Sequence, residues 1–439
     1  MNKINKHSFS TLYDIASGIS TTKAQAGHGS PFVSFSTVFN NYFLPEVLPD
    51  LMDASKSEQE TYSVKKGDIF LTRTSETIDD LAMSCVALKD YPCATFSGFT
   101  KRLRPKATGI AYHKYLGFYL RGHLFRQSVT NHSIMTLRSS FNEEIFALLN
   151  LYLPEYKQQV KIGDFLYSIE QKIKLNNAIN AELEKAAKLL YDYWFAQFDF
   201  PNAEGKPYRA GGGKMVYNER LKREMPKGWQ AVAFNEIVEE NKRPLPDGMD
   251  KTGLLGLDLS IMPGNTMCLN QRGNAKDFNS NRFRLSKYDL LFGSIRPYLR
   301  KAGFSTFDGV ANGTIINLRC KDKQDYSFAL CTLTGNGLFQ YADTRSRGNG
   351  TRMPTINAGE LMGYTVAYDQ KIALAFNNQV SRYWEMIASN INQNFELAEI
   401  RDFLIPLLMN GQVTVATGEA AVTEVKTPAV PTASGAKTR

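Results

Sequence analysis

The sequence has few of the residues that build disulfide scaffolds and metal sites. Its 439 residues include only five cysteines and five histidines, with no CxxC pair and no HExxH motif. An odd, scattered set of cysteines argues against a disulfide scaffold or a zinc ribbon. The cysteines are Cys85, Cys93, Cys268, Cys320 and Cys331.

Long apolar runs are also missing. No stretch approaches the ~20 apolar residues that cross a bilayer. The N-terminal sequence MNKINKHSFSTLYDIASG lacks the apolar core of a signal peptide. We therefore expect a soluble protein of the cytoplasm.

Catalytic motifs are a third absence. The sequence has no GxxxxGK[ST] loop, no GxGxxG turn after a strand and no GxSxG elbow. Gly211-Gly-Gly-Lys follows polar residues and is typical of a linker, and Asp199-Phe-Pro-Asn lacks the second proline of an adenine methyltransferase motif. His113, His123 and His132 are close in sequence, but surface or hydroxyl-paired histidines explain them better than a site. We predict that the chain is not an enzyme and binds no metal or cofactor itself.

What the sequence does have is length, core-forming residues and a modest excess of base. At ~100–200 residues per domain, two or more domains are expected. A hydrophobic content of 43% excludes wholesale disorder. The net charge of +9 suits an anionic partner, most often nucleic acid, without identifying one.

A long internal repeat divides the chain. Four pairs of segments match in the same order in both halves. Residues 12–16 resemble 234–238, 62–70 resemble 283–291, 97–104 resemble 312–319, and 173–190 resemble 387–404. Because the repeat is far longer than a solenoid unit, it predicts two similar domains, each followed by a similar helix.

The pattern of residues changes within each half. Short β-branched and aromatic runs, such as Asp68-Ile-Phe-Leu-Thr, alternate with turn residues and predict strands of a mixed domain. Lys66-Gly-Asp predicts a tight turn before a strand, and Lys287-Tyr-Asp repeats it. The predicted parts are a domain at 1–154, a helix at 155–198, a linker at 199–225, a second domain at 226–366, a second helix at 367–412 and a disordered tail at 413–439.

Each predicted helix carries a heptad seam. From Ile162 to Trp194, apolar or asparagine side chains recur at alternating steps of four and three residues, which is typical of a coiled coil. The seam recurs in the second helix with Arg401 as its charged exception. The alternative is that both helices are ordinary domain core.

Asparagines in the middle of both seams predict a polar layer that fixes register. They are Asn176, Asn180, Asn390 and Asn394. An antiparallel pair would place Asn176 opposite Asn394 and Asn180 opposite Asn390. A parallel pair would also keep the asparagines together, so the seam leaves the direction open.

Basic charge is concentrated in the second half. Residues 282–352 hold eight Arg and four Lys against five Asp, a net 12 − 5 = +7. Arginine suits guanine, asparagine suits adenine, and glycine admits close phosphate approach. The DNA-contact candidates here are Arg296, Tyr298, Arg300, Arg345, Arg347, Asn349 and Arg352. In the first half they are Arg73, Thr74, Lys101 and Arg102. Solvated loops, or in the first half a strand end, are the alternative interpretation.

Several stretches resemble the specificity subunits of type I restriction–modification systems. The most specific runs from Ile162-Gly-Asp through the first helix to Phe198-Asp-Phe-Pro-Asn and Pro226-Lys-Gly-Trp. Residues 395–411 resemble the family's distal helix end, and the resemblance covers about residues 1–412. The usual Pro-Pro-Leu-x-Glu-Gln before the first helix is here Leu153-Pro-Glu-Tyr-Lys-Gln-Gln. Recognition domains vary within the family, so individual base contacts do not carry over.

The resemblance implies an α+β fold class, with two similar mixed α/β target-recognition domains separated by two long helices packed as an antiparallel coiled coil. It implies that each domain reads half of a split site in double-stranded DNA. The chain itself would be non-catalytic and would dock two modification subunits and the restriction subunits. S-adenosylmethionine, ATP and Mg are expected on those partners, and no cofactor on this chain. The alternatives are a coiled-coil scaffold or inactive relative that does not read DNA, or a solitary enzyme with an unrecognised motif.

Overall fold

The computed structural model describes residues 4–75, 77, 80–132, 139–246, 249–277, 282–347 and 353–415. The chain divides into two compact units. The first comprises residues up to 171 together with those from 398 onward, and the second comprises residues 172–397. Two long helices, α7 (Tyr156–Tyr191) and α11 (Gln370–Met409), contribute to both units.

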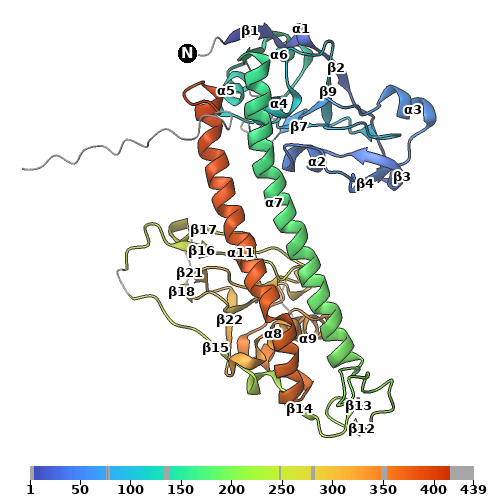
Figure 1. Cartoon of the computed structure of the whole chain (residues 1–439), viewed down its shortest axis with the longest axis vertical. Helices are drawn as coiled ribbons and strands as arrows, with labels where there is room; N and C mark the ends of the chain where they lie inside the picture. Colours follow the sequence, from blue (N-terminus) through green and yellow to red (C-terminus); the bar gives the residue numbers. More distant parts are fainter. Residues whose placement is uncertain are drawn as a thin grey trace, which may run out of the picture. The chain divides into compact units, whose positions relative to one another are not determined.

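The first unit contains two small sheets (Figure 1). The antiparallel sheet has, in spatial order, β2 (Tyr13–Ser17), β9 (Thr100–Pro105), β5 (Ile69–Thr72) and β7 (Ser84–Val86). The second sheet has β4 (Asp50–Met52), β3 (Ala26–Val33) and β8 (Thr95–Phe96), with β3 and β8 parallel. Two strand pairs complete the unit: β1 (Asn5–Ser8) with β11 (Asn150–Leu153), and β6 (Thr74–Ser75) with β10 (Ser139–Ser140).

Short capped helices connect these strands. Ser55 and Glu58 form a capping box at the start of one of them, which satisfies free amides of its first turn. The helices are α1 (Phe9–Leu12), α2 (Phe35–Asn40), α3 (Lys56–Thr61), α4 (His113–Tyr119), α5 (His123–His132) and α6 (Glu143–Leu148), with a 3₁₀ turn, η1, at Lys23–Gln25.

The second unit repeats the two sheets of the first, with one more strand in the second sheet. Its antiparallel sheet has β15 (Val238–Glu240), β22 (Ile315–Cys320), β19 (Leu290–Gly293) and β20 (Ala302–Phe304). Its second sheet has β17 (Gly273–Asn274), β16 (Leu255–Leu257), β21 (Gly309–Asn312) and β18 (Arg282–Leu285), with β16 and β21 parallel. The strand pairs are β14 (Gln230–Ala233) with β23 (Thr365–Tyr368), and β12 (Met215–Asn218) with β13 (Arg223–Pro226).

The shorter α-helices of the second unit follow its antiparallel sheet in the chain, as α4, α5 and α6 do in the first unit. They are α8 (Tyr326–Leu333), α9 (Asn336–Arg347) and α10 (Ala358–Met362), with 3₁₀ turns η4 (Phe234–Glu236), η5 (Ala275–Asp277), η6 (Pro297–Leu299) and η7 (Lys323–Asp325). The predicted repeat and the α+β class are therefore confirmed, because strand order and strand direction in both main sheets correspond.

A buried ion pair marks the same turn in both units. In the first unit, Asp68 is buried and accepts from Arg104 at 2.8 Å (Nε) and 2.6 Å (Nη2). In the second, Asp289 is buried and accepts from Arg319 at 2.9 Å (Nε) and 2.7 Å (Nη2). The residue before each aspartate has a positive φ, +88° at Gly67 and +69° at Tyr288. The predicted tight turns are thus confirmed. Each is held by a carboxylate that would be costly to bury alone.

The two long helices pack antiparallel within each unit. The predicted helices at 155–198 and 367–412 match α7 and α11 closely, and α7 ends in a π-helical turn, η3 (Asp192–Ala196). In the first unit Ile162 and Leu166 are buried on α7. In the second, Trp384 is buried outside the predicted seam and donates to Ser327 on α8 at 2.9 Å. The seam therefore widens where α11 also covers the core of its own unit.

The predicted linker at 199–225 has more structure than a loop. Its ends pack on the aromatic core, because the Phe198 and Phe200 rings lie 5.4 and 5.1 Å from that of Trp229. The hairpin of β12 and β13 begins inside it. The predicted tail falls outside the described residues from 416 onward. Among the described residues, no helix is both long and apolar enough to span a membrane.

Candidate nucleic-acid interface

Three of the predicted contact residues lie on one turn of the second unit. The 3₁₀ turn η6 follows β19, and Arg296 and Arg300 flank it. Arg296 and Tyr298 are exposed, whereas Arg300 is half-buried. The Arg300 guanidinium lies 4.7 Å from the centre of the Phe339 ring on α9. The turn therefore presents one aromatic ring between two arginines, of which Arg300 is held against α9.

Two more predicted residues lie in the last turn of α9. The Arg345 guanidinium is exposed and lies 5.3 Å from the centre of the Tyr341 ring. Arg347 pairs with Asp343 one turn earlier, with Nη2 and Oδ2 2.8 Å apart, and hydrogen bonds to that carboxylate raise the pKa of Arg347. The remaining predictions of this stretch, Asn349 and Arg352, lie outside the described residues.

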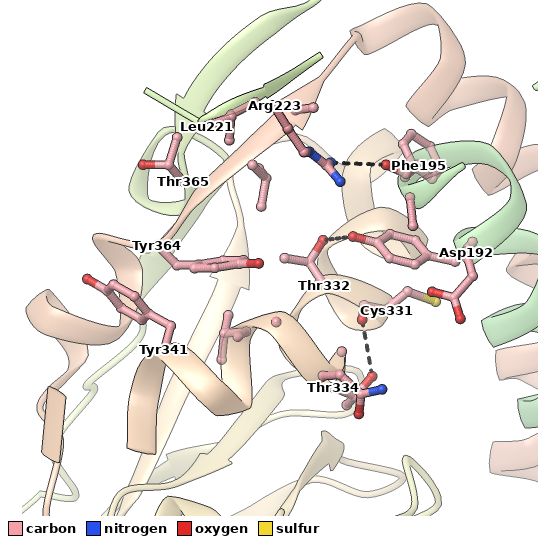
Figure 2. Close-up of a pocket in the computed structure, with 18 of the residues that line it drawn as sticks. Asp192, Phe195, Leu221, Arg223, Cys331, Thr332, Thr334, Tyr341, Tyr364 and Thr365 are labelled. Atoms are coloured by element: carbon pink, nitrogen blue, oxygen red, sulfur yellow. Dashed lines mark hydrogen bonds between the residues drawn. The ribbon is translucent and has the colours of Figure 1, made fainter. Parts of the chain in front are cut away.

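A cavity of about 780 Å³ brings Arg300 and Arg345 into one lining. Figure 2 shows part of this lining. Tyr191, which also lines the cavity, hydrogen-bonds Thr332 with 2.9 Å between the hydroxyl oxygens. Five basic side chains and one carboxylate belong to it: Lys188, Arg220, Arg223, Arg300, Arg345 and Asp192. This excess of positive charge suits an anion such as a DNA phosphate.

Sequence reasoning missed three of these basic residues, since they were assigned to a helix and a linker. Lys188 belongs to α7, Arg220 lies in the turn between β12 and β13, and Arg223 is the first residue of β13. Arg223 donates to the carbonyl of Phe195 at 3.5 Å (Figure 2), and Arg220 donates to that of Ala231 at 2.9 Å. Three basic residues within 220–223 were the signal that could have found them.

In the first unit, Arg73 and Thr74 lie where β5 passes into β6. Arg73 is exposed, and its backbone N–H donates to the Phe99 carbonyl at 2.8 Å. Thr74 pairs with Ser140 in the short β6–β10 ladder. Both residues thus sit at the edge of the unit, and we retain them as proposed DNA contacts.

The other two candidates of the first unit point inward. Lys101 is buried, and its Nζ donates to Ser17 Oγ at 2.8 Å and to Glu143 Oε1 at 3.1 Å. Arg102 is also buried and donates to the Ser63 carbonyl at 2.7 Å, and burial lowers its pKa. Because these side chains satisfy internal partners, we remove Lys101 and Arg102 from the proposed DNA contacts.

The seam asparagines hydrogen-bond to each other in the second unit. Asn176 Nδ2 donates to Asn394 Oδ1 at 2.8 Å, and Asn390 Nδ2 donates to Asn180 Oδ1 at 2.9 Å. These pairs are the ones an antiparallel arrangement requires. Gln393 also accepts from Asn176, at 2.8 Å, and sequence analysis did not foresee it.

The charged exception in the seam has its own partners in the first unit. Arg401 donates to Glu170 on α7 and pairs with Asp402 at 2.8 Å. Its guanidinium also lies 5.2 Å from the Tyr42 ring centre. An arginine is tolerated there because both its charge and its planar face are matched.

Comparisons with known proteins agree with this geometry. Residues 14–185 match the family model described as the type I restriction modification DNA specificity domain. The type I restriction enzyme MjaIX specificity subunit of Methanocaldococcus jannaschii is 23% identical over 367 residues, covering 80% of this chain and 78% of the relative. The HindI specificity subunit of Haemophilus influenzae is 22% identical over 319 residues, covering 60% and 69%.

A solved structure shares the fold. The S subunit of the type I restriction–modification system from M. genitalium superposes with a TM-score of 0.51 at 13% identity, covering 93% of this chain and 96% of that one.

Proposed function

We propose that this chain, which belongs to the specificity subunits of type I restriction–modification systems, is the non-catalytic subunit that selects the DNA sequence. Each of its two recognition domains reads one half of a split site. The observation that carries this proposal is that both units share one strand arrangement and that each has an exposed arginine just after its central strand. These arginines are Arg73 after β5 and Arg296 after β19.

Affinity and discrimination have different sources in this proposal. Lys188, Arg220 and Arg223 in the basic cavity of the second unit supply phosphate contacts, which fix position and give salt-dependent affinity. Base contacts come from exposed side chains such as Arg345, whose guanidinium group matches guanine in the major groove.

The long helices provide the docking surface for partner subunits. In the first unit they expose Phe165, Ile400 and Phe403, and in the second they expose Leu175, Leu189 and Met386. A contiguous patch of exposed apolar side chains is typical of a protein interface, and these residues are the candidates for such a patch on the two helices. We infer that two modification subunits dock on these faces, that restriction subunits join them, and that the complex works in the cytoplasm. S-adenosylmethionine, ATP and Mg would be bound by those partners.

A domain exchange tests the proposal. Residues 226–366 are replaced by the corresponding domain of another specificity subunit, and methylated adenines are mapped in DNA from cells that carry the assembled system. The methylated sequence should change in one half-site only. An unchanged sequence, or a change in both halves, would contradict the proposal.

A second candidate is a scaffold that binds partner subunits without reading DNA. The inward pointing of Lys101 and Arg102 favours it, because this leaves the first unit with fewer exposed basic candidates. Such a scaffold would assemble with partners but show no salt-dependent preference for the mapped duplex.

A further inference from the structure

The turn Arg296–Arg300 has a strained backbone. Both arginines adopt left-handed conformations, with φ of +52° at Arg296 and +54° at Arg300. Side chains other than glycine rarely adopt this region, and strained residues persist only where their surroundings hold them. Such strain in a surface turn calls for a function that the turn's shape serves.

Backbone contacts hold this turn on two sides. The Arg296 N–H donates to the Pro354 carbonyl at 2.8 Å, and the Asn265 N–H donates to the Arg300 carbonyl at 2.9 Å. A Cβ on Gly264 would lie 2.5 Å from the Leu299 carbonyl oxygen, so a glycine is required for that approach. The turn is therefore fixed to its unit rather than free to collapse onto it.

The fixed turn holds two large apolar side chains in solvent. Tyr298 is 48% exposed and Leu299 is 42% exposed, while Pro297, which precedes them in the turn, is buried. Cationic side chains border this pair, with Arg296 and Arg300 on the turn itself. An apolar tip with a cationic border is the chemistry of proteins that insert a side chain between base pairs while arginines hold the flanking phosphates.

We propose that Tyr298 and Leu299 form a wedge that enters the duplex at one base step of the half-site read by the second unit and partly unstacks it. This inference rests on the proposed function. The border of arginines favours DNA over an apolar protein partner, because a protein groove would leave those charges desolvated. The wedge contributes to specificity without base-edge hydrogen bonds, because base steps differ in how readily they unstack.

The test uses the full chain assembled with its modification subunits and a duplex that carries the mapped site. 2-Aminopurine is placed in turn at each step of that half-site except the methylated adenine, since an extruded target base also brightens. The wild-type complex and Tyr298→Phe should brighten the probe at one step. The pair Tyr298→Ala with Leu299→Ala should abolish the signal and weaken binding about 10-fold or more, as loss of a stacked aromatic does. Tyr217→Ala is the matched control, because Tyr217 is 60% exposed in the same unit.

Each result has one meaning. If the wild-type complex binds and methylates the site but brightens no step, or the double variant keeps the signal, the wedge is refuted and the proposed function stands. If the wild-type complex shows no preference for the mapped duplex, both fail. Should the double variant not fold, Tyr298→Ala alone is scored against Tyr298→Phe by the same criteria.

Discussion

The two recognition domains share a framework and differ on its surface. A backbone hydrogen bond lies at the same place after the central strand of each unit, β5 and β19. The Arg73 N–H donates to the Phe99 carbonyl at 2.8 Å in the first unit, and the Ser294 N–H donates to the Thr314 carbonyl at 3.0 Å in the second. In the first unit an exposed aromatic residue belongs to this bond: Phe99, 66% exposed on the β8–β9 turn. In the second, that position holds threonine and the aromatic residue is Tyr298. Both units thus place an exposed aromatic residue near an arginine, but this aromatic residue lies on a different turn in each unit.

The comparison also distinguishes buried polar residues of the sheets from exposed residues of the turns. Arg102 and Asn317 occupy matching positions, opposite Phe70 and Leu291 in the neighbouring strands, and both are buried. Polar residues on this central strand serve the framework in both units. On the turns the two units carry different exposed residues, as reading two different half-sites would require: Arg73 and Phe99 in the first unit, and Arg296 and Tyr298 in the second.

Loss of the framework carboxylate should have the largest effect. Asp289→Ala removes the acceptor for Arg319, Asn317 and the Ser286 N–H, and should lower the free energy of unfolding of the second unit by ~3–5 kcal/mol. Asp68→Ala should do the same to the first unit. Urea unfolding followed by tryptophan fluorescence reports the second unit alone, because all three tryptophans belong to it. Hydrogen exchange reports the first.

The control for these variants is Asp343→Ala, which breaks an ion pair with an exposed arginine and should change stability by less than about 1 kcal/mol. If one aspartate variant lowers the free energy of unfolding strongly and the other only slightly, the buried carboxylate does not stabilise the two units equally.

The next effect concerns DNA discrimination. Arg345→Gln should cost ~1–3 kcal/mol at one base position in the half-site of the second unit if this arginine reads a base. If it contacts a phosphate instead, affinity should fall alike on all sequences and the salt slope by about 1. Lys101→Gln should leave base preference unchanged, because the lysine is buried. Binding titrations on single-base variants of the mapped site measure the effect of each variant. Lys227→Gln is the matched control, because Lys227 is exposed.

Sequence patterns were reliable for the framework for physical reasons. The repeat and both helices follow from periodicity, and the asparagine pairs follow from the cost of burying unpaired amides. The turn at Asp68 was predictable because glycine marks its positive φ. The second copy has Tyr288 there, and only the alignment of repeats reveals it.

The candidate site was less predictable, because the sequence does not show which way a side chain points. Lys101 and Arg102 are basic residues like Arg345, and the sequence alone does not distinguish them. In the structure Lys101 and Arg102 belong to the β5–β9 ladder and their side chains point into the unit. The cavity joins Arg300 to Arg223 across 77 positions of sequence (300 − 223), and only the tertiary fold brings them together. The wedge turn was noted for its arginines, whereas its strain and fixed backbone are properties of the structure.

The smallest predicted effect is a difference in acid sensitivity. Burial lowers the pKa of His113, the first residue of α4, to about 4, with Lys66 and Lys114 acting in the same direction. The first residue of α8 in the second unit is Tyr326, which gains no proton in this range. Between about pH 6.5 and 4 the unfolded chain binds the His113 proton and the folded first unit does not, so stability falls as pH falls through this window. Because His113 is only half-buried, solvent screening reduces the effect to about 1 kcal/mol at pH 5.

His113→Asn should therefore flatten the loss of stability of the first unit between pH 7 and 5, measured by hydrogen exchange, while exposed His28→Asn should not. An equal acid response in His113→Asn and the wild type would show that this histidine does not distinguish the two units.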